Sequence, residues 1–586
     1  MVKDSIGIIF GKTSYLDFKF AVSDISTTKR SDYIKVWHES DGWTLAQISS
    51  ITSSSQAFSV EEAVDVAGGA SKVGELDEHI IAEATVIGSR DKEGVLHVPK
   101  SPFSPGDKVF KADEPLIRQT LGLMRGDVYI GLLEGQNIRV NLDGNNLVQK
   151  HCSILAKTGA GKSYTGGVII EELLDKSVPL LIIDPHGEYA TLKYPNEEKS
   201  TSFERYGISP KGYTAQVTVY TPANKLLNPA ADSLFRLNGI NLGIKDFVQL
   251  FSEDTSQNQT GILFEAVSKL KAEKETYDIN DIIFEVGQNK SKVKWNVINK
   301  LEVLKETGIL SDKATSINEL IQDGRASIID MKGVNPDLQA LIVAKLCSDL
   351  FDARKLNTIP PMMLVLEEAH NFCPEKGFGR TISSDILRTI ASEGRKFGLG
   401  LMVVSQRPAR VDKNILSQCN TQIIMKVTNP NDLQAISKGL EGISSDVEED
   451  IKRLSPGVAM IVSTYIERPI LVDIRTRKSK HGGASVPVVK SQAAQMQAET
   501  VVPQIKEKAT PLLPSTDSIL KKLLPAPGKE KPVENKERIK KEPIEEKKNE
   551  IIKEPPEEKI EKEARKKSRA KRGAGILTKM FGSRKK

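Results

Sequence analysis

The sequence predicts an α/β protein whose parallel sheet follows a small N-terminal β-domain and precedes a C-terminal tail that does not fold. Residues 150–235 and 325–480 alternate short apolar runs with helical segments, and near-continuous apolar runs are typical of parallel strands buried on both faces. Residues 1–115 instead contain short β-branched or aromatic runs separated by Gly, Ser and Asp turns. Beyond about residue 486, Pro, Lys and Glu dominate, and such a segment buries too little apolar area to offset the entropy of ordering.

These changes in composition predict five regions. Residues 1–115 are expected to form a small β-barrel that serves assembly or partner docking, and residues 116–242 form the first part of the α/β core. Residues 243–322 lose the strand signals and read as helices, for example "DFVQLF" and "GILFEAVSKLKAEKE", which predicts a helical insert. Residues 323–485 complete the core, and residues 486–586 form a disordered tail with a basic end.

The formal net charge of +6 does not describe the body of the protein, because residues 564–586 hold ten basic residues and no acid. The rest carries a net charge of −4, so any nucleic-acid site there must be local, in loops or a channel. Four widely spaced cysteines without a C-x-x-C pattern argue against a zinc site or a disulfide framework. The sequence also lacks a long apolar run and a signal-peptide layout. We therefore expect a soluble, cytoplasmic protein without a membrane partner.

A glycine-rich stretch, "ILAKTGAGKSYT", lies between an apolar strand and a segment with helical spacing. It matches the phosphate-binding pattern G-x-x-x-x-G-K-[ST], except that Ala156 replaces the first glycine, where one methyl group is a mild change. Glycines let successive N–H groups point at an anion on a helix N-terminus, the lysine reaches the β- and γ-phosphates, and the serine hydroxyl binds Mg²⁺. ATP and Mg²⁺ are therefore the expected cofactors. The expected nucleotide-binding residues are Thr158, Gly159, Ala160, Gly161, Lys162, Ser163 and Tyr164.

A second constellation is "MMLVLEEAH", an apolar strand that ends in Glu367 and Glu368. P-loop ATPases place two acids there: the first contacts Mg²⁺ through water, and the second polarises the attacking water. Ser163 and Glu367 are therefore the expected Mg²⁺ residues, and Glu368 is the expected catalytic acid. Exposed acids at a strand end are the simpler alternative. His370 is expected to pack or to cap rather than to catalyse.

Three further side chains are candidates for the same site. Asp184 ends the strand of "LLIIDPHGEY", which we place beside the P-loop strand, and it either orders metal or water or caps a turn. Gln406 ends the strand of "GLMVVSQRP", where an amide can sense the γ-phosphate or position water. Arg395 lies at a helix end in "ASEGRKFG". There an arginine is either solvated or, in a ring ATPase, reaches the γ-phosphate of the neighbouring subunit.

The order of these motifs, together with the N-terminal barrel, resembles the HerA family of archaeal DNA-translocating ATPases, within the FtsK–HerA branch of RecA-like motors. The resemblance is carried by the P-loop, "IIDPHGEY", "LVLEEAHNF" and "IASEGRKFGLGLMVVSQRP", and it covers roughly residues 1–480. It implies a RecA-like core in a homohexameric ring that threads duplex DNA. It further implies that the barrel docks the nuclease NurA for end resection in double-strand-break repair.

The resemblance also assigns residues. It matches Lys162 and Ser163 to the phosphate and Mg²⁺ residues, Glu368 to the catalytic acid, Gln406 to the sensor and Arg395 to the arginine finger. The departures are Ala156 and the glutamate at 367, which is one methylene longer than the commoner aspartate.

A DNA contact is expected in "PEKGFGRTISSD", directly after the strand that carries the acids. In a RecA-like ring this segment can face the central channel, and Lys376 and Arg380 would then hold DNA phosphates without reading sequence. A plain surface loop is the alternative. Two other functions use the same core: a coupling ATPase that pumps DNA or protein in transfer or secretion, and a nucleotide-gated scaffold ring.

Overall fold

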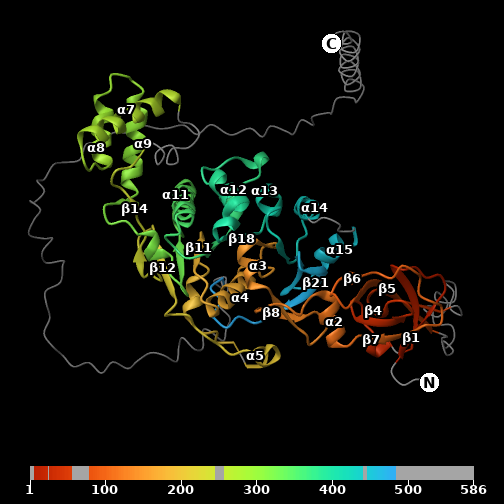
Figure 1. The fold of residues 1–586 in the computed structure, drawn as a ribbon. Helices are drawn as coiled ribbons and strands as arrows, with labels where there is room; N and C mark the ends of the chain where they lie inside the picture. The colour runs from red at the N-terminus through yellow and green to blue at the C-terminus, as the bar shows by residue number, and fades with distance from the viewer. Residues whose placement is uncertain are drawn as a thin grey trace, which may run out of the picture. The chain divides into compact units, whose positions relative to one another are not determined.

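The described part of the chain comprises six segments of the computed structural model (Figure 1): residues 5–23, 25–55, 78–198, 200–243, 256–439 and 445–483. The predicted tail, residues 486–586, and the predicted helical stretch "DFVQLF" lie outside the described residues. Among the described residues, no helix combines the length and the apolar character that a membrane span requires.

Six antiparallel strands close the N-terminal barrel in the order β1-β2-β5-β4-β3-β7, with β7 pairing again with β1. The bounds are β1 Ser5–Phe10, β2 Asp17–Val22, β3 Tyr33–His38, β4 Gly42–Ser55, β5 Glu78–Arg90, β6 Leu96–His97 (paired with β5) and β7 Lys108–Lys111. Side chains alternate between the interior and the surface, so that in β2 Phe18 and Phe20 are buried and Lys19 is exposed. The prediction of a small β-barrel is confirmed.

The core is built on one twelve-stranded sheet with the order β13-β12-β16-β11-β17-β18-β10-β19-β20-β21-β8-β9. The bounds are β8 Val128–Leu133, β9 Arg139–Leu142, β10 Cys152–Leu155, β11 Leu180–Asp184, β12 Val217–Thr221, β13 Ser233–Leu234, β16 Ala326–Asp330, β17 Met362–Leu366, β18 Leu399–Ser405, β19 Thr421–Ile424, β20 Val458–Ser463 and β21 Ile466–Ile474. Pairs from β13 to β19 are parallel, whereas pairs from β19 to β9 are antiparallel.

Two expectations about this sheet are wrong. The sheet is not parallel throughout. The stretch "GVAMIVST", which was expected to be a parallel strand, forms β20, and the short turn between β20 and β21 makes these two strands pair antiparallel. The strand that ends in Asp184, β11, does not lie beside the P-loop strand β10, because β17 and β18 lie between them. Crossover connections let strands that are distant in sequence become neighbours, so sequence order alone did not reveal this arrangement.

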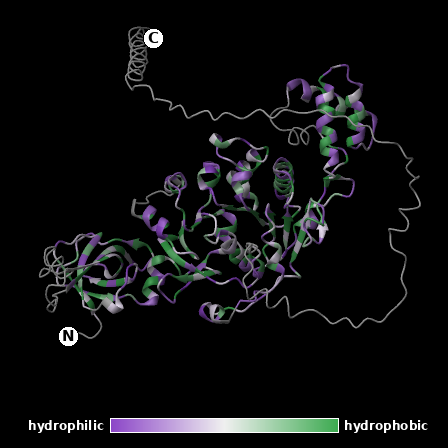
Figure 2. Cartoon of the chain, turned by 180° about the vertical axis from the view of Figure 1, so that it is seen from behind, coloured by the Kyte–Doolittle hydropathy of each residue, from purple (hydrophilic) through white to green (hydrophobic). Residues whose placement is uncertain are grey.

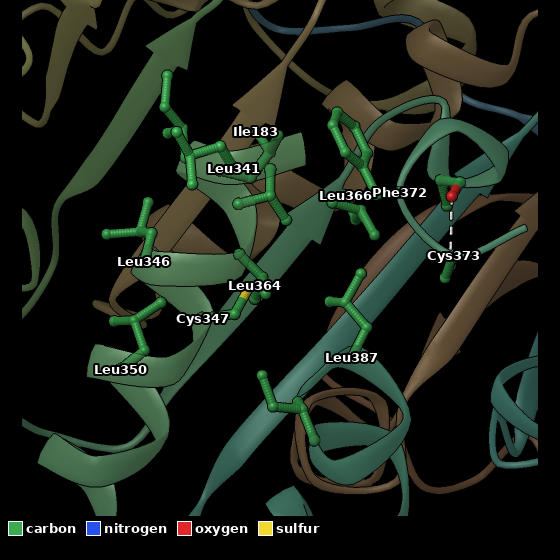
Figure 3. Close-up of a cluster of buried hydrophobic side chains, with 14 of the residues drawn as sticks. Ile183, Leu341, Leu346, Cys347, Leu350, Leu364, Leu366, Phe372, Cys373 and Leu387 are labelled. Atoms are coloured by element: carbon green, nitrogen blue, oxygen red, sulfur yellow. Dashed lines mark hydrogen bonds between the residues drawn. The ribbon is translucent and has the colours of Figure 1, made fainter. Parts of the chain in front are cut away.

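Helices cover both faces of the parallel strands. In β17, Leu364 and Leu366 pack in a cluster with α11 (Pro336–Lys355) and α12 (Ser384–Glu393), which Figure 3 shows. The alternate residues Met363 and Val365 belong to the other cluster, with the buried side chains of α4 (Lys162–Asp175). Figure 2 shows the corresponding concentration of hydrophobic residues on the sheet strands. The α/β class is confirmed, with strands buried on both faces.

The described residues between β14 (Leu237–Asn238) and β15 (Leu310–Ser311), two short strands that pair in parallel, form three helices. They are α7 Gln257–Glu273, α8 Ile279–Gln288 and α9 Lys294–Glu306. Capping boxes begin α7 and α8, and their buried residues pack with those of α9. The predicted helices that lie in the described residues of the insert are present, whereas the proposed domain boundaries stay predictions.

The remaining helices connect these layers. They are α2 Glu114–Leu121, α3 Gly144–Gln149, α5 Ser200–Tyr206, α10 Ile317–Leu320, α13 Lys413–Leu416, α14 Pro430–Gly439 and α15 Ser445–Arg453, with 3₁₀ turns η1 Ile25–Thr27, η2 Ala190–Lys193, η3 Ala369–Asn371, η4 Lys376–Phe378, η5 Gly394–Phe397 and η6 Pro408–Arg410.

Candidate nucleotide-binding and catalytic site

The glycine-rich loop leaves β10 between β18 and β19 and leads directly into α4. Gly159 and Gly161 adopt φ values of 78° and 106°, a region that glycine enters without strain. Ala156 is not among the residues with positive φ, is fully buried, and donates its N–H to the carbonyl of Ser405 over 3.2 Å. The departure from the usual first glycine is therefore accommodated, because this position needs neither a special backbone conformation nor open space.

Several backbone N–H groups lie close together where the glycine-rich loop meets α4. The N–H groups of Gly159, Gly161, Lys162 and Ser163 have no hydrogen-bond acceptor within the part of the chain that the structure describes. Free N–H groups and the positive end of the helix dipole together favour an anion. This end of α4 can hold phosphate groups.

Lys162 faces both acids at the end of β17. Its ammonium contacts Glu367 and lies 3.0 Å from Glu368 Oε1. The Ser163 hydroxyl lies 3.2 Å from Glu367 Oε1. Burial alone would lower the pKa of Lys162, but the two carboxylates raise it above its usual value. The lysine therefore stays charged, and bound phosphates would compete with the carboxylates for it.

Glu367 is fully buried and has a further partner that sequence reasoning missed. The Tyr189 hydroxyl donates to Glu367 Oε2 over 2.7 Å. Burial raises the pKa of Glu367, and Lys162 and Tyr189 oppose that rise. The only sequence sign of Tyr189 is its place in the "DPHGEY" motif, five residues after Asp184.

Glu368, the second residue after β17, adopts the left-handed conformation, with φ 50° and ψ 46°. This conformation is unusual for a residue other than glycine, and such strain concentrates at functional sites. Its side chain is almost fully buried. Glu368 Oε2 lies 3.3 Å from His370 Nδ1, and that ring nitrogen also lies 3.1 Å from the Ser405 hydroxyl at the end of β18.

Gln406 follows β18 and contacts the tip of the glycine-rich loop. The Thr158 hydroxyl donates to the Gln406 side-chain oxygen. Because β18 pairs with both β10 and β17, its end lies between the loop and the two acids. The role of this amide as a sensor of the terminal phosphate stays a prediction.

Asp184 is fully buried at the end of β11, where its carboxylate accepts N–H groups from the following turn. Oδ1 accepts from His186 (3.3 Å) and Gly187 (2.9 Å), and Oδ2 accepts from Tyr189 over 2.9 Å. Burial raises the pKa of this carboxyl to about 7, and the backbone donors limit the rise. These bonds are those of a turn cap, and they fix the segment that carries Tyr189. Its catalytic role stays a prediction.

Arg395 lies at the opposite edge of the sheet. It is exposed in η5, just before β18 begins. The seven residues of β18 separate it from Gln406, which corresponds to roughly 20 Å at the rise of a strand. The structure does not bring Arg395 to the P-loop of its own chain. A finger role would require a neighbouring subunit and stays a prediction.

Two loops follow β17 and β18, and we call them the loop pair: residues 374–380 and 407–413. Their basic side chains are exposed, whereas Pro408, Val411 and Asp412 are buried. Pro374 and Val411 form a β-bridge between them, and the Glu375 N–H donates to the Arg410 carbonyl over 2.8 Å. The candidate DNA residues Lys376 and Arg380 are exposed on the first loop, where Arg380 also pairs with Asp385 at 2.6 Å. Sequence reasoning missed the basic residues of the second loop, which are Arg407, Arg410 and Lys413.

Behind the P-loop helix, the chain after β21 crosses α4 as a strap of residues 475–481. Arg475 is fully buried and pairs with Glu171 and Glu172 of α4, each at 2.9 Å. The backbone N–H of Arg477 donates to the Tyr164 hydroxyl over 2.9 Å. No sequence motif predicted the contact between Arg475 and Glu171, because the two residues are more than 300 positions apart in the sequence.

Comparison with known proteins identifies a family match around the P-loop. Residues 128–350, from β8 into α11, match the model of the family described as "Helicase HerA, central domain". This part of the chain is therefore similar to the central domain of HerA helicases. The resemblance predicted from the motifs is thereby confirmed.

Curated relatives extend the HerA likeness over most of the chain. The DNA double-strand break repair helicase HerA of Pyrococcus furiosus is 26% identical over 82% of this chain and 94% of that protein. The DNA double-strand break repair helicase HerA of Saccharolobus solfataricus is 28% identical over 62% of this chain and 71% of that protein. Among solved structures, VirB4 of Thermoanaerobacter pseudethanolicus is 14% identical, with a TM-score of 0.44 over 60% of this chain and 96% of that one.

Mg²⁺ is the ion implied by the HerA resemblance, and the side chains at the predicted position suit it. Ser163 and Glu367 present a hydroxyl and a carboxylate oxygen 3.2 Å apart, and Mg²⁺ prefers such hard oxygen donors, completed by water and phosphate. Ser163 also carries one of the N–H groups at the start of α4 that have no acceptor in the described residues. The donor set therefore fits the ion.

Proposed function

We propose that this protein is an ATP-driven DNA translocase or helicase that hydrolyses ATP at the edge of the sheet where β10, β17 and β18 end. One observation carries the proposal. Lys162, Ser163, Glu367, Glu368 and Gln406 come from distant parts of the sequence and meet within hydrogen-bonding reach of one another or of the glycine-rich loop.

Each residue then has a definite task in hydrolysis. Lys162 leaves the two carboxylates and binds the β- and γ-phosphates. Ser163 and Glu367 would hold Mg²⁺, which would supply charge neutralisation for the phosphates. Glu368 orients and deprotonates the attacking water, and Gln406 contacts the terminal phosphate. Tyr189 keeps the carboxylate of Glu367 in place through its 2.7 Å hydrogen bond.

DNA is the proposed substrate because curated relatives are described as DNA double-strand break repair helicases. The loop pair supports a DNA contact, since it presents exposed basic side chains next to the catalytic edge. We further propose a homohexameric ring around duplex DNA, and a NurA-like nuclease as the partner in end resection. The N-terminal barrel is the proposed docking domain.

Hydrolysis with and without duplex DNA tests the enzyme assignment. Glu368→Gln should bind ATP normally and stop turnover, because the amide cannot take a proton from water. Lys162→Ala should also lose nucleotide affinity, because the phosphates lose their charge partner. Glu273→Gln, an exposed change on α7, is the matched control and should hydrolyse ATP like the wild type. Near-normal turnover in Glu368→Gln would place the catalytic acid elsewhere, with Glu367 or Asp184 next.

The DNA path has a separate test. The double variant Lys376→Ala with Arg380→Ala should bind duplex DNA more weakly and with a shallower salt dependence, because each phosphate contact releases counterions. Fluorescence anisotropy at several salt concentrations measures both effects. Unchanged affinity and salt slope would exclude this loop from the DNA path. Native mass spectrometry of the assembly tests the ring and the nuclease partner.

A further inference from the structure

The turn between α8 and α9 of the helical insert (Figure 1) is strongly basic. Residues 289–300, "NKSKVKWNVINK", hold four lysines and no acidic residue. Other lysines of the insert face carboxylates: Lys269 lies 2.7 Å from Glu285, and Lys274 lies 2.5 Å from Asp281. Because the protein outside residues 564–586 carries a net charge of −4, this cationic turn is a local exception.

Two of these lysines have no counter-charge. Lys290 and Lys292 are exposed, and neither forms an ion pair with another described residue. The turn itself is held, because the Ser291 N–H donates to the Asn289 side-chain oxygen over 2.9 Å, and the Asn289 amide donates to Glu265 of α7 over 3.0 Å. Two ammonium groups are thus presented on a fixed turn, where an anion can neutralise both.

A tryptophan follows these lysines directly. Trp295, at the start of α9, is 61% exposed, although an indole is among the side chains that gain most from burial. The Lys294 ammonium lies over its ring, 5.7 Å from the centroid, and donates to the Gly287 carbonyl of α8 over 2.7 Å. The lysine therefore orients the indole, while the indole stays accessible to a ligand.

Ammonium groups next to an accessible aromatic ring suit a nucleic-acid strand with unpaired bases. Phosphates bind lysines whatever the sequence, and a base stacks on a flat aromatic side chain. In a duplex the bases stack on one another and are paired, so they do not reach an indole on a helix surface. Asn299, exposed one turn further along α9 from Trp295, adds an amide that can bond to a base or a phosphate.

We propose that the α8–α9 turn is a binding site for single-stranded nucleic acid, with phosphates on Lys290 and Lys292 and a base stacked on Trp295. This site shares no residue with the catalytic edge or the loop pair. It goes beyond the proposed function, which assigns duplex DNA to the loop pair. It requires neither ATP hydrolysis nor a ring, so either proposal can fail without the other.

Tryptophan fluorescence tests the base contact directly. The chain has three tryptophans, so Trp37→Phe with Trp43→Phe, both in the barrel, leaves Trp295 as the only one. An oligo(dT) of about 16 nucleotides, the upper site size of one single-strand-binding domain, should quench Trp295 and shield it from acrylamide. An abasic strand and a duplex of the same length should do neither. Oligo(U) identifies the sugar: quenching by both strands assigns the site to single strands in general, and quenching by one alone assigns it to DNA or to RNA.

Salt dependence tests the phosphate contacts. In the same single-tryptophan chain, Lys290→Ala with Lys292→Ala should weaken the binding that Trp295 reports. The slope of log affinity against log salt should become shallower by about 1.4, because each of two phosphates on a single strand contributes roughly 0.7. Lys271→Ala with Lys274→Ala, two exposed lysines at the C-terminal end of α7, is the matched control and should leave the affinity and the slope unchanged.

Crosslinking gives a second local readout in the otherwise unaltered chain. An oligo(dT) that carries 5-iodouracil crosslinks under light to an aromatic ring on which it stacks. The crosslinked peptide should contain Trp295; the crosslink should disappear in Trp295→Ala and persist in Trp295→Phe, which keeps a flat ring. If the barrel substitutions lower the thermal midpoint so far that the single-tryptophan chain is unfolded, the crosslink decides alone. Because both signals arise at Trp295, binding at the loop pair or at the basic residues 564–586 does not mask them.

The remaining outcomes contradict the site. Quenching by the abasic strand or the duplex as strong as that by oligo(dT) would leave only a general contact with polyanions. A folded chain whose Trp295 is quenched by neither single strand has no such site. Emission that changes with protein concentration alone would show that a second copy of the chain covers Trp295. None of these results touches the proposed function, whose own test is ATP hydrolysis.

Discussion

The buried arginine behind the P-loop helix allows a sharp test of what holds that helix. Replacing Arg475 with methionine keeps the volume and removes a guanidinium whose N–H groups make five hydrogen bonds. Removing one member of a buried ion pair typically costs about 3–5 kcal/mol, because the partner charge stays buried and unpaired. The carboxylates of Glu171 and Glu172 are those partners.

The structure places the expected cost at the lower end of that range. After the substitution Glu171 still accepts from Lys478 N and from the Ser479 N–H and hydroxyl, and Glu172 keeps the Lys478 ammonium. We therefore expect a loss of about 3 kcal/mol, which corresponds to a decrease of roughly 100-fold in the protection of α4 amides from hydrogen exchange. Exchange is the suitable assay, since global unfolding of a chain with several domains is not two-state.

Two further variants make this result interpretable. Arg453→Met removes an arginine that is 71% exposed and 3.5 Å from its partner Glu449, and exposed pairs are worth less than about 1 kcal/mol. Arg475→Lys keeps the charge with fewer donors and should fall between the wild type and Arg475→Met. If α4 amides in Arg475→Met exchange like those of the Arg453→Met control, the strap does not stabilise the P-loop helix.

Three other predictions concern single positions. A methyl group at Gly167 would lie 2.6 Å from a buried guanidinium, whereas a methyl group at Gly261 in α7 would meet open space. Gly167→Ala should therefore lower the thermal midpoint, and Gly261→Ala should add about 0.5–1 kcal/mol of stability. Equal shifts of the thermal midpoint in the two variants would contradict the packing around Gly167. Burial raises the pKa of Asp184 to about 7, so its contribution to stability is full below 3.8 and is lost as the pH rises toward 7. Asp184→Asn should therefore flatten the pH dependence of unfolding by up to about 1.4 kcal/mol per pH unit, and an unchanged slope would show that another group titrates. If Arg395 acts in trans, mixing inactive Arg395→Ala and Lys162→Ala chains should restore some hydrolysis; no recovery after verified subunit exchange would refute the finger.

The clustering of the candidate nucleotide-site residues could be predicted from the sequence because these residues occupy fixed places in local motifs. Lys162 and Ser163 follow a glycine-rich loop, while Glu367 and Gln406 directly follow buried strands. Parallel strands end at the same edge of a sheet, so residues after their C-terminal ends meet whatever the strand order. This is why the wrong position of the Asp184 strand did not disturb the rest of the site.

The residues that sequence reasoning missed depend on contacts that no local pattern encodes. Tyr189 reaches Glu367 only because the turn capped by Asp184 directs it there. Arg475 lies in a polar stretch that reads as a surface segment, yet it is fully buried by its charged partners on α4. The antiparallel half of the sheet was missed for a related reason, since apolar runs alone do not give strand direction.

The strand order of the core has a consequence for biosynthesis. The P-loop strand β10 ends at Leu155, but its two neighbours, β18 and β19, begin only at Leu399 and Thr421. At typical elongation rates of about 5–20 residues per second, a growing chain carries β10 without either partner for roughly 10–50 s. During that interval its unpaired apolar edge is open to wrong pairing. Ribosome-arrested chains should accordingly protect β10 from proteolysis only when residues well beyond Ile424 have left the exit tunnel.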